Sequence, residues 1–314
     1  MKLYKSNLDF PIVFVSGQIR TGKVFLIKLL STFKKYEKPY MSALFEQVFT
    51  LKHINKITYE VAEYLIVKFL NIIHYNQAIG RDLNLRSEEI TSIKNYYNSN
   101  RYLNKIKTES SKAYKKTLRE RYTIPFMLHN GILEAELILE SKKNSKIIEI
   151  FKNPFELVYS WKRKNYFGPF FKNARSEILS IEHKNIILPY LFHKKKFFHK
   201  IRKKKIYQFL CELILHVEKK KLNSYENLNN RLKKRILLIN FKDLLHFKII
   251  KEKLEKFLKV KTNKNTIKVF LKEKNFNRRK TSEIKLEIKN NISPKIFKEM
   301  CILEKKINNL GSIK

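Results

Sequence analysis

Two segments of the chain combine residue types that could bind phosphate. Residues 13–26 and 146–161 each read as an apolar strand, a short turn that carries a cation, and the start of a helix. Such a turn presents free backbone N–H groups and the positive end of a helix dipole to an anion. Two turns of this kind on one sheet predict a ligand with two separate phosphate groups.

The first turn matches most of a nucleotide-binding pattern. Residues 17–23 fit the first seven positions of G-x-x-x-x-G-K-[ST]. The eighth position is Val24, where the pattern places a hydroxyl that holds Mg²⁺. We also find no Asp after a strand in the manner of a second metal ligand. The sequence therefore predicts phosphate binding without a metal ion.

The elements that position these turns follow from hydrophobic spacing. The predicted strands are the apolar runs 11–16, 124–128, 146–151 and 235–240. The predicted helices are 22–34, most of 41–120, 131–141, one opened by Asn153 and Pro154, one ending near 258, and 293–311. Alternating strands and helices predict an α/β fold, a central parallel sheet flanked by helices as in P-loop NTPases.

The simplest domain organisation is a single domain over residues 1–314. A basic helical insertion is expected at about 165–235, and residues 259–292 are expected to be rich in loops. The two cysteines, Cys211 and Cys301, lie far apart without metal-ligand spacing, which is typical of a reducing compartment. The N-terminal apolar run is too short for a signal peptide or a membrane span, so a cytoplasmic location is expected.

The charge of the chain indicates an anionic partner. The formal net charge is +40, from 68 basic and 28 acidic side chains. A nucleotide, a nucleic acid, an acidic glycan or a membrane surface would suit this balance. The abundance of Lys, Ile, Asn, Phe and Tyr also fits compositional drift of an AT-rich genome. The basic clusters at 194–205 and 218–235 are therefore interpreted as solvated faces first and binding surfaces second.

Four ordered motifs resemble those of the PAPS-dependent sulfotransferases. Residues 20–26 are similar to that family's [KR]-[ST]-G-T-T-[WL]-L, and residues 146–160 to its K-x-I-x-x-x-R-N-P-x-D-x-x-x-S. Residues 239–244 resemble its Y-E-D-L segment, and residues 278–281 resemble its late basic loop. This chain departs from the family where Lys23 and Val24 replace two threonines and Lys152 replaces an arginine.

The resemblance implies binding of PAPS (3′-phosphoadenylyl sulfate) and its product PAP, with no metal. It assigns the 5′-phosphosulfate to the loop residues Arg20, Thr21, Gly22, Lys23 and Val24 and adenine stacking to Phe25. It assigns the 3′-phosphate to Lys152 and Ser160, helped by Arg278, Arg279 or Lys280. Arg20 and Lys23 would also offset the charge that develops as sulfate leaves. From the residues alone, Phe25 could equally be packed in the core.

Sulfuryl transfer also requires a base that takes the proton from the acceptor hydroxyl. The resemblance offers two candidates, Glu46 and His129, and the sequence leaves the choice open. Each also has a structural alternative, an exposed helix residue for Glu46 and a capped or core residue for His129. The expected acceptor is a carbohydrate or glycolipid.

Two other function classes remain open on the sequence. One is a P-loop nucleotide kinase or NTPase, against which Val24 counts. The other is a non-catalytic binder of polyanions or nucleic acid, although no specific nucleic-acid motif occurs. A peripheral membrane contact and the oligomeric state are left open as well.

Overall fold

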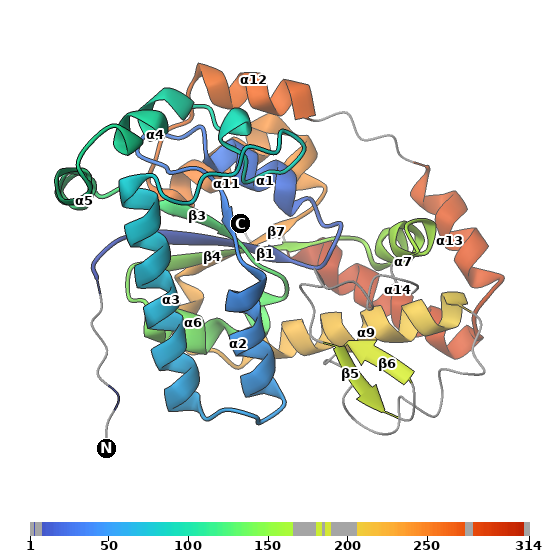
Figure 1. Ribbon diagram of the computed structural model, residues 1–314. Coiled ribbons are helices and arrows are strands. Elements are labelled where there is room, and N and C mark those ends of the chain that lie inside the picture. The colour runs from blue at the N-terminus through green and yellow to red at the C-terminus, as the bar shows by residue number, and fades with distance from the viewer. Residues whose placement is uncertain are drawn as a thin grey trace.

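A parallel sheet of five strands runs through the centre of the molecule (Figure 1). The computed structural model describes residues 3, 8–165, 180–183, 186–189, 206–273 and 279–310. The strands of the sheet are β1 (Ile12–Gly17), β2 (Tyr40–Met41), β3 (Ile124–Met127), β4 (Ser145–Phe151) and β7 (Ile236–Asn240). Their order is β2-β3-β1-β4-β7, and every neighbouring pair is parallel. The predicted fold class is confirmed.

Helices cover both faces of this sheet. They are α1 (Lys23–Leu30), α2 (Ala43–His53), α3 (Tyr59–Ile79), α4 (Ser99–Ile106), α5 (Ser110–Glu120), α6 (Ala135–Ser141), α7 (Pro154–Arg163), α9 (Ile206–Glu226), α10 (Asn230–Lys233), α11 (Phe247–Leu258), α12 (Lys264–Glu273), α13 (Thr281–Lys289) and α14 (Pro294–Asn309). Short 3₁₀ turns occupy Ile93–Asn95, Gly131–Glu134 and Asp243–Leu245. A separate antiparallel hairpin pairs β5 (Ser180–His183) with β6 (Ile186–Pro189).

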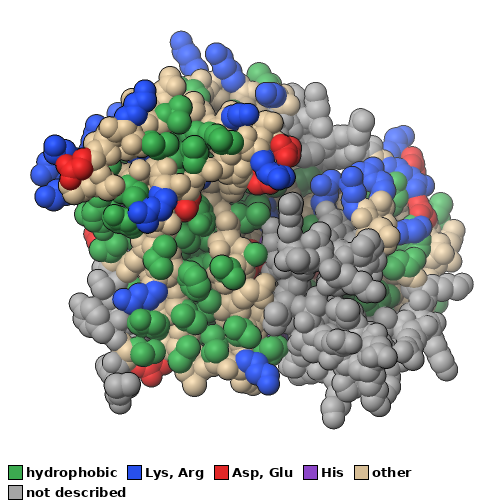
Figure 2. All heavy atoms as spheres, viewed as in Figure 1, with side chains coloured by type: hydrophobic (Ala, Val, Ile, Leu, Met, Phe, Trp, Pro, Cys, Tyr) green, Lys and Arg blue, Asp and Glu red, His purple; other side chains and the backbone are tan. Residues whose placement is uncertain are grey.

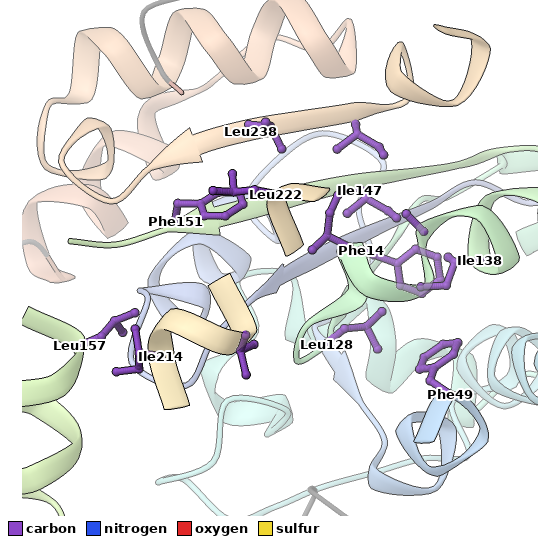
Figure 3. Close-up of a cluster of buried hydrophobic side chains, with 14 of the residues drawn as sticks. Phe14, Phe49, Leu128, Ile138, Ile147, Phe151, Leu157, Ile214, Leu222 and Leu238 are labelled. Carbon is purple, nitrogen blue, oxygen red and sulfur yellow. The ribbon is translucent and has the colours of Figure 1, made fainter. Parts of the chain in front are cut away.

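The alternation of side chains along each strand builds two cores. In β1, Phe14 faces the core beneath α2, α3, α6, α7, α9 and α14, whereas Val13 and Val15 face the core beneath α1, α11 and α12. Figure 3 shows part of the first core, where Phe14 and Ile147 of the sheet lie near side chains from the covering helices. Because both faces are buried, the strands read as continuous apolar runs.

Two stretches differ from the sequence prediction. Residues 259–292 contain the helices α12 and α13, so the expectation of a loop-rich segment was wrong. Each of these helices buries only a narrow stripe, such as Ile284 and Ile288 in α13, which weakens the periodic signal. The 165–235 region includes the β5–β6 hairpin besides helices, and α9 contributes buried side chains to the first core. The basic cluster 194–205 lies outside the described residues.

Candidate functional site

The carboxyl ends of the parallel strands bring the predicted site residues to one edge of the sheet. The turn after β1 and the turn after β3 contact each other directly. The backbone N–H of Asn130 donates to the carbonyl of Gly17 at 3.4 Å, and that of Gly131 donates to Ser16 Oγ at 2.7 Å. In open α/β sheets this edge, next to the point where the strand order reverses, is where ligands bind.

The turn between β1 and α1 requires its two glycines. Gly17 and Gly22 have φ angles of 148° and 92°. A Cβ on Gly17 would lie 2.6 Å from Thr21 Oγ1, and one on Gly22 would lie 2.8 Å from the ring of Phe241. Arg20 also has a positive φ, 72°, and its side chain is exposed. The backbone therefore forms a tight loop in which positions 17 and 22 require glycine.

Two polar side chains of this loop bond back to the loop itself. Thr21 Oγ1 donates to the carbonyl of Gln18 at 2.8 Å. Lys23 Nζ donates to the carbonyls of Gly17 and Gln18, both at 2.8 Å, although the side chain is only 4% exposed. The ammonium charge therefore lies at the loop, beside the first N–H groups of α1, which have no partner within their helix. An anion placed there would meet both.

The next two residues of α1 point in different directions. Val24 is exposed, so an aliphatic side chain stands where P-loop enzymes place a hydroxyl. Phe25 is 3% exposed, and its ring lies 5.6 Å from that of Phe270 in α12. This burial agrees with the core-packing alternative. The stacking role that the resemblance implies for Phe25 stays a prediction.

Glu46 and His129, the two alternative bases, lie in contact. His129 Nδ1 is 3.1 and 3.2 Å from the two carboxylate oxygens of Glu46, and the His129 backbone N–H donates to Oε1 at 3.0 Å. Both side chains are about nine-tenths buried, with 10% and 8% exposed. A carboxylate in this position can orient an imidazole. The two candidates thus lie together as one buried pair, whereas the sequence presents them as alternatives, and a role as the base stays a prediction.

Adjacent strands explain why this pair forms. Strand β2 pairs with β3 through Met41 and Met127, so the residues that follow each strand lie side by side. Ser42 caps α2 by accepting from the backbone N–H of Phe45 at 3.3 Å, which fixes the first turn that carries Glu46. β2 has only two residues, too few to be recognised in the sequence. The contact was therefore missed although both residues were named.

Lys152 lies just before α7, and Ser160 lies in the second half of this helix. Asn153 caps the helix by accepting from the Phe155 N–H at 2.9 Å, as the Asn-Pro sequence predicts. Lys152 follows β4 directly and is 12% exposed, with Nζ 3.9 Å from Glu156 and 4.6 Å from the centre of the Phe241 ring. Ser160 lies further along the helix and is half-buried. Their roles toward a 3′-phosphate stay predictions.

Helix α13 brings the late basic loop next to α7. The guanidinium of Arg279 lies 5.7 Å from the centre of the Tyr159 ring, next to Ser160 in sequence. Arg279 forms ion pairs with Glu283, at 3.1 Å, and with Glu287. Lys280 is exposed at the N-cap of α13, whereas Arg278 lies outside the described residues.

Trp161 connects helix α7 to the loop after β1. Its Nε1–H donates to the carbonyl of Ile19 at 3.0 Å, and the side chain is 6% exposed. The sequence predicts a core residue here, and the side chain is buried as predicted. The hydrogen bond adds a function that the sequence did not reveal, because it holds α7 against the loop after β1.

A buried ion cluster joins β4 to α9. Lys221 Nζ lies 2.8 Å from Glu149 and 3.0 Å from Glu218, and all three side chains are fully buried. Burial raises the pKa of Glu218. Glu149 is in register with Ser16, two residues before the loop. Local sequence patterns carry no signal for this cluster, because Glu149 of β4 and the two α9 residues lie far apart in the chain.

On the face that Figure 2 shows, the described Lys and Arg side chains lie over several helices. Figure 2 shows Lys and Arg side chains over α5, α12 and α13, whereas hydrophobic side chains predominate over α2 and α3. In the described ranges, His, Cys, Asp and Glu side chains do not gather in groups of three or more that could hold a metal ion. Every described helix is too short or too polar to cross a bilayer.

No protein-family model and no curated protein matches the sequence. Among solved structures, the fold is similar to a sulfotransferase domain from the curacin biosynthetic pathway, with 13% identity, a TM-score of 0.47, and coverage of 96% of this chain and 99% of that chain. A sulfotransferase domain from the Synechococcus PCC 7002 olefin synthase gives 11% identity and a TM-score of 0.44, with 98% of each chain covered. The sulfotransferase STF9 from Mycobacterium avium gives 8% identity and a TM-score of 0.41, with 97% of this chain and 77% of that chain covered. The chain is thus similar in structure, at low sequence identity, to proteins whose names call them sulfotransferases.

Proposed function

We propose that the protein transfers a sulfuryl group from PAPS to a hydroxyl of an acceptor, which we infer to be a carbohydrate or glycolipid. The observation that carries the proposal is the buried Glu46–His129 pair on the sheet edge that also holds the phosphate loop. A general base beside an anion site is what sulfuryl transfer to a hydroxyl requires.

The loop after β1 suits the phosphosulfate end of the donor. Its two glycines let the backbone turn tightly before the N-terminus of α1, and the Lys23 ammonium is already held at this loop. PAPS, when bound, would supply the sulfuryl group. Arg20, exposed on the same loop, and Lys23 would offset the negative charge that grows on the leaving oxygen.

The 3′-phosphate is assigned to the start of α7 and the neighbouring end of α13. Lys152 and Ser160 would bind it, with Arg279 and Lys280 at the rim. Support comes from the position of Arg279 over Tyr159, which brings the late basic loop beside the α7 serine. Each charge-assisted hydrogen bond of this kind contributes roughly 1.5–3 kcal/mol.

Proton removal is assigned to the Glu46–His129 pair. The carboxylate fixes the orientation of the imidazole through Nδ1 and stabilises the positive charge that the ring gains with the acceptor proton. The acceptor class rests on Glu46, because the carbohydrate and tyrosine sulfotransferases of the family that the sequence resembles place a glutamate base in about this region.

Calorimetric titration at about 0.15 M salt tests the proposal, because this ionic strength suppresses non-specific polyanion binding. We expect micromolar binding of PAP that weakens in Lys152→Ala but not in Lys268→Ala, which removes an exposed charge from α12. Binding of ATP with Mg²⁺ and not of PAP would replace this proposal with a nucleotide kinase. Equal binding of any polyanion would replace it with a non-catalytic binder.

A further inference from the structure

A cavity of about 350 Å³ lies at the opposite edge of the sheet, where the strands begin. Ile12 and Thr123, at the starts of β1 and β3, form part of its wall, and Leu258 closes it from α11. We call it the amino-edge cavity. Four cationic side chains line it, Arg121, Lys143, Lys146 and Arg235, and its lining contains no acidic side chain. None of these residues belongs to the candidate site at the carboxyl edge.

Two of these cations are held in place by backbone carbonyls. Arg235 donates to the carbonyls of Ser145 at 3.0 Å and Leu139 at 2.9 Å, and Lys146 Nζ donates to that of Phe257 at 2.6 Å. Carbonyl dipoles fix the direction of a cation but carry no net charge. The negative charge of Glu140, which pairs with Arg231, also acts on Arg235 from outside the lining. The walls of the cavity are therefore positively charged and rigid.

The other two cations face the cavity from its rim. Arg121 pairs with Asp9 at 2.8 Å, and the side chain of Asn144 in the lining also donates to Asp9. The exposed ammonium of Lys143 makes no hydrogen bond or ion pair to a described residue. Burial and the positive charge of Lys259 lower the pKa of Lys146, as expected where positive charges crowd together.

We propose that the amino-edge cavity binds a phosphate dianion, either inorganic phosphate or a small phosphate monoester. A concave site with charge of one sign and low-dielectric walls concentrates the field on its opening and attracts a counter-ion. The volume is at the lower end of the range of small-molecule pockets, which fits a small anion. Lys143 and Arg121 would complete the hydrogen bonds, and Arg235 and Lys146 would supply the fixed charge.

Methyl NMR of the full-length protein distinguishes this site from the phosphate loop, because each site has its own reporters. Ile12 and Leu258 line the amino-edge cavity, whereas Ile19 and Val24 belong to the loop region. Inorganic phosphate is added at about 0.15 M salt, which screens exposed charges. We expect saturable shifts of the Ile12 and Leu258 methyl signals. Shifts confined to Ile19 and Val24 would overturn the proposal.

Matched charge variants separate a built site from general attraction to a basic protein. Lys143→Ala removes an exposed side chain, so the fold should persist, and we expect phosphate to bind at Ile12 and Leu258 about tenfold more weakly. Lys268→Ala removes the same charge from an exposed position on α12 that is not part of the cavity lining, and it should change the affinity less than twofold. Equal weakening by both variants would contradict the proposal. Loss of binding in Lys143→Glu with retention in Lys152→Ala would support it.

Discussion

The two predicted phosphate positions differ in how their cations are held. At the loop after β1, Lys23 bonds to the carbonyls of its own loop. At the start of α7, Lys152 lies 3.9 Å from Glu156, and Arg279 pairs with Glu283 and Glu287. The first position is built by a few consecutive residues, whereas the second is assembled from β4, α7 and α13. We infer that the first is formed before ligand binding and the second exchanges internal carboxylates for phosphate.

Replacing either member of the acid–base pair should have the largest effect. In His129→Gln and Glu46→Gln we expect kcat for sulfuryl transfer to fall by about 10²–10⁴, because the acceptor proton loses its base. PAP affinity should change less than threefold, since neither residue is assigned to phosphate. Steady-state kinetics and calorimetry measure the two quantities. An unchanged kcat in both variants would remove the pair from the mechanism.

Removing the Lys23 ammonium from the loop after β1 should have the second-largest effect, a loss of affinity for PAP. For Lys23→Ala we expect PAP to bind about 10–150-fold more weakly, the equivalent of roughly 1.5–3 kcal/mol for a charge-assisted contact. Lys34→Ala, which removes an exposed charge shortly after α1, is the matched control and should bind normally. Thermal melts of both variants establish that the loop still folds. Equal dissociation constants for the two variants would contradict a preformed first position.

Loss of the hydrogen bond from Trp161, which joins α7 to the loop after β1, should weaken PAP binding less than loss of Lys23 does. Trp161→Phe keeps most of the buried ring volume but removes the donor to the Ile19 carbonyl. A neutral hydrogen bond contributes about 0.5–1.5 kcal/mol, so we expect PAP affinity to fall about two- to tenfold. Calorimetric titration of the variant and the unmodified protein with PAP, at the same salt concentration, measures this affinity. If affinity is unchanged while thermal stability falls, the tryptophan supports only the core.

Removing the Glu287 carboxylate that pairs with Arg279 should have the smallest effect, and it should strengthen PAP binding. A hydrogen bond from Tyr207 lowers the pKa of Glu287, which keeps this carboxylate charged against the arginine at neutral pH. In Glu287→Gln we expect PAP to bind up to about threefold more tightly, because a competing anion is gone. Glu299→Gln breaks an exposed ion pair with Lys219 on another surface and serves as the control. Weaker binding in Glu287→Gln would mean that the carboxylate positions Arg279 for phosphate.

The sequence predicted the parts of the fold that depend on local patterns. The four long strands of the sheet and the caps Asn153 and Ser293 were found because apolar runs and Asn-Pro or Ser-Pro pairs carry their own signal. The loop-rich prediction for 259–292 failed because narrow buried stripes are weak signals. The Glu46–His129 contact depends on the pairing of β2 with β3, and the Lys221 cluster depends on the packing of α9. Neither long-range arrangement is encoded in local spacing.

A comparison of PAP with adenosine 5′-monophosphate tests the two-position site most directly. Both ligands carry a phosphate for the loop after β1, but only PAP carries one for Lys152 and Ser160. We predict that PAP binds at least about tenfold more tightly than the monophosphate, and that Lys152→Ala removes this advantage while leaving the monophosphate affinity unchanged. Equal affinities of the two ligands in the unmodified protein, or an equal loss for both in Lys152→Ala, would contradict the account.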